Sequence, residues 1–430
     1  PDKGLISYIA SDYNTGWMHG DIKLATLSDT DTTNVTGTNL ISGDAASDDT
    51  NSLGDFSSQT GGTLSINTNA SYVKVGSRSI HIIATQGASG GRYYKANFLT
   101  IGKTYTISGF LNASNGSASN KAQFYLGGTD GASNYGAQDE FCSVANTWNS
   151  FSHTFTALTT HLSISFVEQG SGNATDFYVD GLEVRLAEED RSVNGNGLQV
   201  FGTVTKTAVA TGADLVSYSG FSSSNYLVQP YNSQLDFGTG DFSFMVWVKP
   251  DSTSSGQYVF QLNNSDSSKY IHFLAQHSSA SLFNATGTAY ISNGTQAPAG
   301  VWSCYCGVRR GNILELYLDG NLVSSVVSTA GDVADGTSTL TIGNRDSKTS
   351  AGAFNGNLAL FRISATAPSA EQIAKIYNDE KHLFKENAKA TLYGTSDEVH
   401  ALAYDDDTEL LHVGTSAGRS DFQGLRRINN

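Results

Sequence analysis

Proline, cysteine and charged residues are all scarce in this chain of 430 residues. It contains 5 prolines, 3 cysteines and 15% Asp, Glu, Lys and Arg. No apolar run approaches the roughly 18 residues that cross a bilayer. The sequence therefore predicts neither a membrane-inserted segment nor a disulfide framework. Cys304 and Cys306 lie two residues apart and share one face of a predicted strand, and we interpret them, together with Cys142, as buried thiols.

Basic residues are also few. The chain has 25 Lys and Arg against 40 Asp and Glu, which gives a net charge of −15 and a pI near 4.9. Binding to nucleic acid or to an anionic membrane surface needs clustered Lys and Arg. Because the sequence has no such cluster, we exclude nucleic acid and anionic lipid as partners.

The chain is rich instead in residues that form strands and turns. It has 45 glycines, 20 tyrosines and 21 phenylalanines. We predict an all-β protein with two β-sandwich (jelly-roll) domains, a short C-terminal helix and terminal strands like a propeller blade. Changes in local composition divide the chain into an N-terminal strand and linker region (1–37), a jelly roll (38–187), a linker (188–197), a second sandwich with a terminal helix (198–388) and a blade-like segment (389–430).

Local patterns support this division. Tyr105–Phe110 and Leu162–Val167 alternate apolar and polar residues, as half-buried strands do. The pair Asp319 and Gly320 between two apolar runs predicts a hairpin. Helical spacing of apolar residues predicts one helix over Ser369–Glu386, which begins with a capping box. Since the chain begins at Pro1, close to a predicted strand, we expect it to be part of a longer polypeptide.

Three segments of the second sandwich resemble laminin-G-like or concanavalin A-like lectin domains: Phe237–Lys249, the hairpin Leu316–Gly320, and Phe354–Ile363. The resemblance covers about 198–388 and implies a lectin-like sandwich. The preceding region is similar to jelly rolls of carbohydrate-binding modules, through Gly76–Ile80, Gly102–Ser108 and Phe177–Val184.

The order of these domains, ending in Ala403–Ser416, resembles tail-fibre and appendage proteins of marine bacteriophages. That resemblance implies a virion-surface or extracellular protein that recognises host cell-surface polysaccharide, forms a homotrimer and contacts other virion proteins. Two alternatives stay open: a purely structural protein of fibre self-assembly, and a secreted bacterial adhesin or glycan-binding accessory protein.

Aromatic residues are the candidates for stacking on sugar rings. Trp247 and Trp302 fall in apolar runs and are predicted to lie in the core, whereas Trp148 lies between a loop and a strand. The sequence does not rank the tyrosines. The candidate carbohydrate-binding residues are Trp148, Tyr93, Tyr94, Tyr135 and Tyr226.

Asp180 lies where the resembled jelly rolls often supply a ligand to a structural calcium ion, so the resemblance implies calcium as a cofactor. Asp55 is its loosely matching acidic partner; a solvated turn aspartate is the alternative.

We predict no enzymatic activity, because a retaining hydrolase needs two carboxylates about 5–5.5 Å apart and no strand offers such a pair. Glu315 is the one strand-borne candidate, since it alternates with the apolar Leu314 and Leu316.

Overall fold

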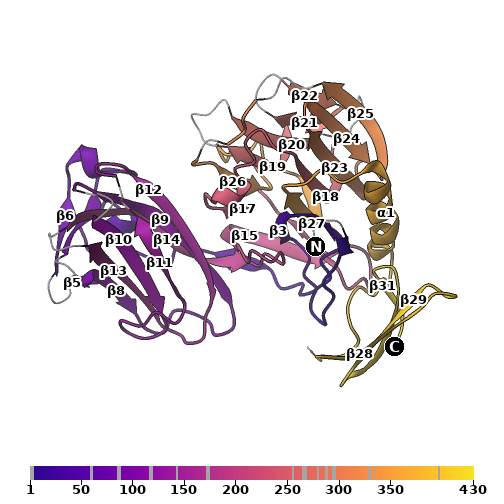
Figure 1. The fold of residues 1–430 in the computed structure, drawn as a ribbon, viewed down its shortest axis with the longest axis horizontal. Helices are drawn as coiled ribbons and strands as arrows, with labels where there is room; N and C mark the ends of the chain where they lie inside the picture. The colour runs from indigo at the N-terminus through magenta and orange to yellow at the C-terminus, as the bar shows by residue number, and fades with distance from the viewer. Residues whose placement is uncertain are drawn as a thin grey trace. The chain divides into compact units, whose positions relative to one another are not determined.

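The computed structural model describes residues 4–58, 62–84, 89–115, 120–141, 144–170, 175–253, 256–263, 269–277, 280–285, 289–292, 297–327, 331–334, 336–395 and 398–430. The chain forms two compact units (Figure 1). The small unit comprises residues 37–187 with 197–199, and the large unit comprises 1–36, 188–196 and 200–430. The predicted all-β class, with one short helix near the C-terminus, is confirmed.

The small unit is a sandwich of two five-stranded antiparallel sheets. One sheet has the order β11-β10-β13-β8-β5, and the other has the order β6-β7-β14-β9-β12. The strands and short 3₁₀ helices are η1 (Asp44–Ala46), β5 (Phe56–Ser58), β6 (Gly62–Asn67), η2 (Ala70–Tyr72), β7 (Ser79–Ala84), β8 (Ser89–Lys95), β9 (Thr104–Ala113), β10 (Asn120–Gly127), β11 (Gly136–Phe141), β12 (Asn149–Thr156), β13 (Leu162–Gly170) and β14 (Thr175–Glu188).

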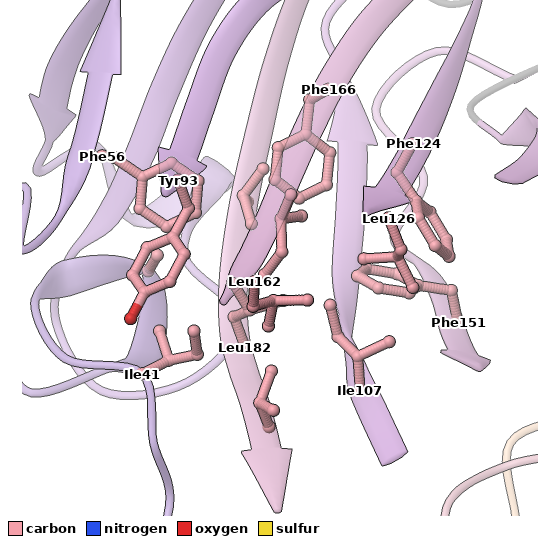
Figure 2. Packing of buried hydrophobic residues seen from close by; sticks show 14 of the residues in the cluster. Ile41, Phe56, Tyr93, Ile107, Phe124, Leu126, Phe151, Leu162, Phe166 and Leu182 are labelled. Atoms are coloured by element: carbon pink, nitrogen blue, oxygen red, sulfur yellow. The ribbon is translucent and has the colours of Figure 1, made fainter. Parts of the chain in front are cut away.

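Alternate residues of these strands form the core between the two sheets. Figure 2 shows Leu162 and Phe166 of β13 packed among Phe124 and Leu126 of β10. In β14 the inward face changes at Gly181, where φ is +57° and the pairing with β9 shifts register. This irregularity keeps apolar side chains inside on both sides of it, a use of β-bulges that a strict alternation pattern does not show.

The main body of the large unit has three layers, a helix and two sheets, and the unit also contains the terminal sheet described below. The first sheet runs β25-β24-β23-β18-β27, with β16 and β3 beside β27; the second runs β17-β26-β19-β20-β21-β22. Its elements are β1 (Leu5–Ile6), β2 (Met18–His19), β3 (Ile22–Thr26), β4 (Val35–Gly37), β15 (Leu198–Ala208), β16 (Val216–Ser219), β17 (Tyr226–Gln229), η3 (Ser233–Leu235), β18 (Phe242–Pro250), β19 (Gln257–Asn263), β20 (Tyr270–His277), β21 (Ala280–Ala285), β22 (Ala289–Ser292), β23 (Ser303–Arg310), β24 (Ile313–Leu318), β25 (Asn321–Val327), β26 (Thr339–Ile342), β27 (Gly356–Ser364), α1 (Ala370–Glu380), η4 (Lys381–Phe384), β28 (Val399–Asp405), β29 (Leu410–Thr415), β30 (Gly418–Gln423) and β31 (Arg426–Asn429).

Strand β18 is apolar on both faces because it lies between the other two layers. Phe244 packs against Phe260 and Phe273 of the second sheet, with ring centroids 4.9 and 5.1 Å apart. On the other face, Trp247 packs under α1 and its ring stacks on Phe384 at 4.1 Å. A strand covered on both sides reads as a continuous apolar run, which is what the sequence has there.

The helix and the hairpin form where the sequence predicts them. Ser369 and Gln372 make both hydrogen bonds of a capping box. The α-helix ends at Glu380 and continues as the 3₁₀ turn η4, so it is shorter than the predicted Ser369–Glu386. Between β24 and β25, Asp319 and Gly320 both have positive φ (48° and 79°), as a tight hairpin turn requires.

The N-terminal region (1–37) and the linker (188–197), which the sequence separates from the two sandwiches, lie mainly in the large unit. Ile22–Thr26 forms β3 beside β27. In the segment 188–196, the carboxylate of Asp190 accepts hydrogen bonds from the backbone N–H groups of Ala25 (2.9 Å), Ser192 (2.8 Å) and Asn196 (2.9 Å). Burial raises the pKa of this carboxyl group. The segment is therefore tied to the N-terminal strand by buried polar contacts.

Cys304 and Cys306 on β23 are buried free thiols, as predicted, and burial raises the pKa of Cys306 to about 12. Cys142 lies outside the described residues. No helix among the described residues has the length and apolar character needed to cross a membrane.

The C-terminal strands β28 to β31 form a four-stranded antiparallel sheet in sequence order, the yellow strands of Figure 1. Asn14 ties this sheet to the rest of the large unit, since its side-chain amide donates to the carbonyls of Ala390 (2.8 Å) and Leu425 (3.0 Å).

Candidate functional site

Two of the predicted sugar-stacking residues are core residues. Tyr93 is fully buried in the core of the small unit, next to Phe56, with ring centroids 5.1 Å apart. Tyr135 is 8% exposed, and its hydroxyl accepts hydrogen bonds from the backbone N–H groups of Leu158 (3.1 Å) and Thr159 (3.0 Å). Neither ring offers a face to a ligand, so we withdraw both as stacking platforms.

Tyr94 points the other way from Tyr93 and is 37% exposed. Its ring stacks on His161 at 5.9 Å between centroids, with an interplanar angle of 28°. Both rings line a hollow of about 320 Å³ at the surface of the small unit. The other residues that line it are Ile101, Gly128, Thr129, Leu158, Thr159 and Thr160.

The Tyr94 hollow combines apolar and hydroxyl-bearing side chains. Ile101 and Leu158 are each 61% exposed, so two apolar side chains and the Tyr94 ring line the same part of the surface. Thr160 Oγ1 lies 3.1 Å from His161 Nδ1, so the imidazole is fixed in place. A shallow surface of this kind can pack against a ring and exchange hydrogen bonds at its edge.

Trp148 and Tyr226 are both half-buried and belong to different units. Trp148 immediately precedes β12 in the small unit. Tyr226 begins β17 in the large unit, where its ring stacks on Phe201 at 4.7 Å and Lys348 Nζ lies 5.8 Å from its centroid. The structure therefore does not gather the predicted residues into one site, and neither Trp148 nor Tyr226 lies in the Tyr94 hollow.

Asp180 is completely buried and its carboxylate accepts four hydrogen bonds. The donors to Oδ1 are the Ser47 hydroxyl (2.6 Å) and the Gly181 N–H (2.8 Å); those to Oδ2 are the N–H groups of Lys74 (2.6 Å) and Val75 (2.9 Å). This carboxylate organises the loops around η1. To bind calcium directly it would have to give up some of these bonds.

The loop that begins at η1 contains a second buried carboxylate, on Asp44. Its Oδ1 accepts from the N–H groups of Thr50 (2.9 Å) and Asn51 (3.1 Å), whereas its Oδ2 is buried and has no partner among the described residues. Asp55, the acidic partner suggested by the sequence, is instead paired with Lys95 at 3.3 Å. No cluster of three or more His, Cys, Asp or Glu side chains suited to a metal occurs in the described ranges. Calcium here would need carbonyl and hydroxyl oxygens as further ligands.

Glu315 on β24 makes contacts with its neighbours rather than with a second carboxylate. Its Oε2 accepts a hydrogen bond from the Tyr317 hydroxyl (3.1 Å) and lies 3.4 Å from Arg310 Nη2. Burial, followed by the charge of Glu315, raises the pKa of Tyr317 to about 12. This arrangement holds Glu315 in position by a cation and a phenol.

Part of the large unit matches a known family. Residues 221–374 match the family model of the concanavalin A-like lectin/glucanases superfamily. The match begins just before β17 and ends inside α1, so it covers most of the two-sheet sandwich. It confirms the lectin-like resemblance over this segment. The search of curated proteins found no match to the chain.

Several solved structures are also similar. Domain 4 of an extracellular arabinanase from Geobacillus stearothermophilus, in complex with arabinotriose, is 15% identical over 44% of this chain and 92% of that one, with a TM-score of 0.38. The binding domain of Paraclostridial Mosquitocidal Protein 1 is 14% identical over 53% of this chain and 61% of that one, with a TM-score of 0.37. The CBM40 of the Ruminococcus gnavus IT-sialidase, bound to α2,3-sialyllactose, is 14% identical over 33% of this chain and 84% of that one, with a TM-score of 0.29. At these values the likeness carries no assignment of residues or ligands.

Proposed function

We propose that this chain is a non-catalytic glycan-binding protein and that the Tyr94 hollow of the small unit holds a sugar ring. The observation that carries the proposal is the hollow itself, in which an exposed tyrosine ring lies beside two exposed aliphatic side chains. Its volume of about 320 Å³ is at the lower end of the range of ligand sites. The superfamily match of residues 221–374 in the large unit supports the same class of function.

The chemistry of the hollow suits a sugar. The C–H face of a pyranose is apolar and can pack against Tyr94, while the hydroxyl groups at its edge can bond to Thr160 and to the His161 imidazole. A shallow open site of this kind binds weakly. Many copies on one particle would raise the overall avidity without any new contact.

We further propose that the chain is a segment of a phage tail fibre or appendage. In this role it would bind host cell-surface polysaccharide from the virion surface or outside the cell, form a homotrimer and contact other virion proteins. The support is the order of its parts: a jelly-roll-like unit, a lectin-like sandwich, one helix and a terminal four-stranded sheet. A secreted bacterial adhesin shares this order and stays the alternative assignment.

A structural role in self-assembly is the second candidate function, and the edge strand β25 favours it. Its side chains are mostly exposed, with Leu322 at 52% and Val327 at 77%. An exposed apolar edge strand is a template for pairing with another chain. Homotrimerisation through such an edge is compatible with glycan binding elsewhere on the chain.

Calcium is the cofactor that we propose for the small unit. Asp44 would coordinate the calcium ion directly, because its Oδ2 is buried without a partner among the described residues. Asp180 would hold the surrounding loops in position. Bound calcium would compensate the cost of burying a carboxylate oxygen with no hydrogen bond.

The test of glycan binding is an array of bacterial surface glycans probed with the whole chain, followed by titration calorimetry. We expect Tyr94→Ala to weaken binding by about two- to tenfold, because an aromatic contact of this size is worth roughly 0.5–1.5 kcal/mol. Tyr8→Ala is the matched control, since Tyr8 is a 41% exposed tyrosine of the large unit. Absence of any binding on the array would refute the proposed function.

A further inference from the structure

A larger cavity lies in the large unit, between α1 with η4 and the terminal sheet. Its volume is about 540 Å³. Figure 1 shows α1 next to the yellow strands, and a Cβ on Gly424 in the β30–β31 turn would lie 3.7 Å from the Asp379 side chain. The cavity is lined by Trp17, Lys375, Asn378, Asp379, His382, Tyr404, Glu409, Leu411, Phe422, Gln423, Gly424 and Arg426.

Trp17 forms one wall and is held rigidly. Its indole Nε1–H donates to Asp379 Oδ2 (2.7 Å), and its backbone N–H donates to Glu380 Oε1 (2.9 Å). The preceding residue, Gly16, has φ +68°, and a side chain there would collide with Glu380. A ring fixed in this way is a preorganised surface, because little side-chain entropy is lost when a ligand packs on it.

Tyr404 lines the cavity from the sheet side. By the register of the sheet, Tyr404 lies opposite Leu411, which lies opposite Phe422, so the three share one face. Phe422 is 1% exposed in a small core, but Tyr404 on the edge strand β28 is 59% exposed. The apolar face of the terminal sheet therefore extends beyond the part that the rest of the large unit covers.

The polar groups of the cavity have balanced charge. Lys375 and Arg426 are cations, and Asp379 and Glu409 are anions. Burial, with the charges of Lys385 and Lys381, lowers the pKa of His382, which keeps the imidazole neutral at pH 7. The amides of Asn378 and Gln423 add donors and acceptors without charge.

Not all of these groups are already paired. Lys375 Nζ lies 2.8 Å from Asp379 Oδ2, so these two charges satisfy each other. Arg426 Nε is buried and has no hydrogen-bond partner among the residues that the structure describes. That Nε is out of reach of a ligand, but the rest of the half-buried Arg426 guanidinium group makes no hydrogen bond or ion pair with the described residues, and the exposed Glu409 lies in the same lining.

We propose that this cavity is a second glycan site, distinct from the Tyr94 hollow, that takes an uncharged oligosaccharide. Trp17 and Tyr404 pack against sugar rings, and Arg426 and Glu409 bond to hydroxyl groups. The proposal rests on the proposed function for its ligand class. An uncharged ligand follows from the balanced charge of the lining, and a polyhydroxylated one follows from the unpaired donors beside aromatic rings.

The experiment uses the whole chain on an array that holds neutral and acidic oligosaccharides of two to six sugars, followed by calorimetry with the neutral glycan that binds best. We expect Tyr404→Ala to lower the affinity at this site by about two- to tenfold and Arg426→Gln to lower it by about tenfold. Leu402→Ala is the matched control, because Leu402 is on the same strand, is 67% exposed and does not line the cavity. Thermal unfolding of each variant checks that the fold is intact.

The outcomes separate this site from the Tyr94 hollow. Binding of a neutral glycan that survives Tyr94→Ala and is lost with Tyr404→Ala supports the second site. Glycan binding that Tyr94→Ala abolishes and that both cavity variants leave unchanged overturns it, while the proposed function stands. Binding of acidic glycans only, through Arg426, overturns the assignment of an uncharged ligand. Self-association that Tyr404→Ala disrupts, with no glycan bound, overturns both proposals in favour of a protein interface.

Discussion

Glu380 at the end of α1 is the residue whose change should most disturb the large unit. Its side chain is fully buried, and its carboxylate accepts hydrogen bonds from Nη1 and Nη2 of Arg362 on β27, in an ion pair whose Arg362 side chain is 3% exposed. The same carboxylate accepts the Trp247 indole N–H (2.8 Å) and the Trp17 backbone N–H (2.9 Å). One side chain thus joins the helix, the first sheet and the N-terminal segment.

We expect Glu380→Gln to destabilise the large unit by about 3 kcal/mol, the lower end of the range for breaking a buried ion pair. The glutamine keeps the shape and one acceptor oxygen, but it leaves the Arg362 guanidinium buried without an anion. Glu380→Ala should cost about 5 kcal/mol, because the indole and backbone donors also lose their acceptor.

Urea unfolding followed by tryptophan fluorescence measures this directly, since Trp17 and Trp247 both contact Glu380. At a slope of 1–3 kcal/mol per molar, a loss of about 3 kcal/mol lowers the midpoint by about 1 M or more. Glu386→Gln, an exposed carboxylate just past η4, is the control and should leave the midpoint nearly unchanged. An unchanged midpoint in Glu380→Gln would refute the reasoning. Equal losses in Glu380→Gln and Arg362→Met, with no further loss in the double variant, would identify the pair as one unit.

Four further predictions concern the remaining buried and surface groups. The hydrogen bond from His412, with further contributions from Arg419 and Asn429, lowers the pKa of Asp421. The Asp421 carboxylate therefore stabilises the fold above the ordinary Asp pKa of about 3.9, and this contribution is lost as pH falls below that value. The difference in stability between the wild type and Asp421→Asn should close in acid, as measured by urea titrations from pH 7 to 3. Calcium should raise the unfolding temperature of the chain, and Asp44→Asn should remove that rise; equal temperatures in calcium and in chelator would contradict the proposed site. Light scattering at micromolar concentration should give the mass of a trimer, and a monomer would exclude this assembly. Incubation with bacterial capsular polysaccharide should release no new reducing ends, whereas release abolished by Glu315→Gln would show that the chain is a hydrolase.

The parts of the fold that the sequence predicts are those with local causes. The alternation in Leu162–Val167, the capping box at Ser369 and the turn residues Asp319 and Gly320 all act within a few residues, and all three appear in the structure. The position of β3 could not be predicted in this way. It pairs with β27, more than 300 residues away, and the local sequence of Ile22–Thr26 does not indicate which strand it pairs with.

In the candidate sites, too, only the features with local causes could be predicted from the sequence. A signal that separates Tyr93 from Tyr94 is present in the sequence, because Arg92 and Tyr94 share one face of β8 and a charged residue marks the outer face. The rest of the Tyr94 hollow comes from loops, whose side chains show no periodic pattern. The second cavity combines Trp17, α1 and the terminal sheet, and only the folded chain brings these segments together.

The described lining of the two hollows holds few carboxylates, and one of them is already engaged. The described lining of the Tyr94 hollow holds no Asp or Glu side chain, and in the second cavity Asp379 is already bonded to Lys375 and to the Trp17 indole. A glycosidase needs one carboxyl group with a raised pKa that donates a proton and a second one across the bond. Glu409 is exposed to water. Fixed aromatic rings beside hydroxyl, amide and guanidinium groups would hold a ligand without activating it, which is the arrangement that the proposed non-catalytic role requires.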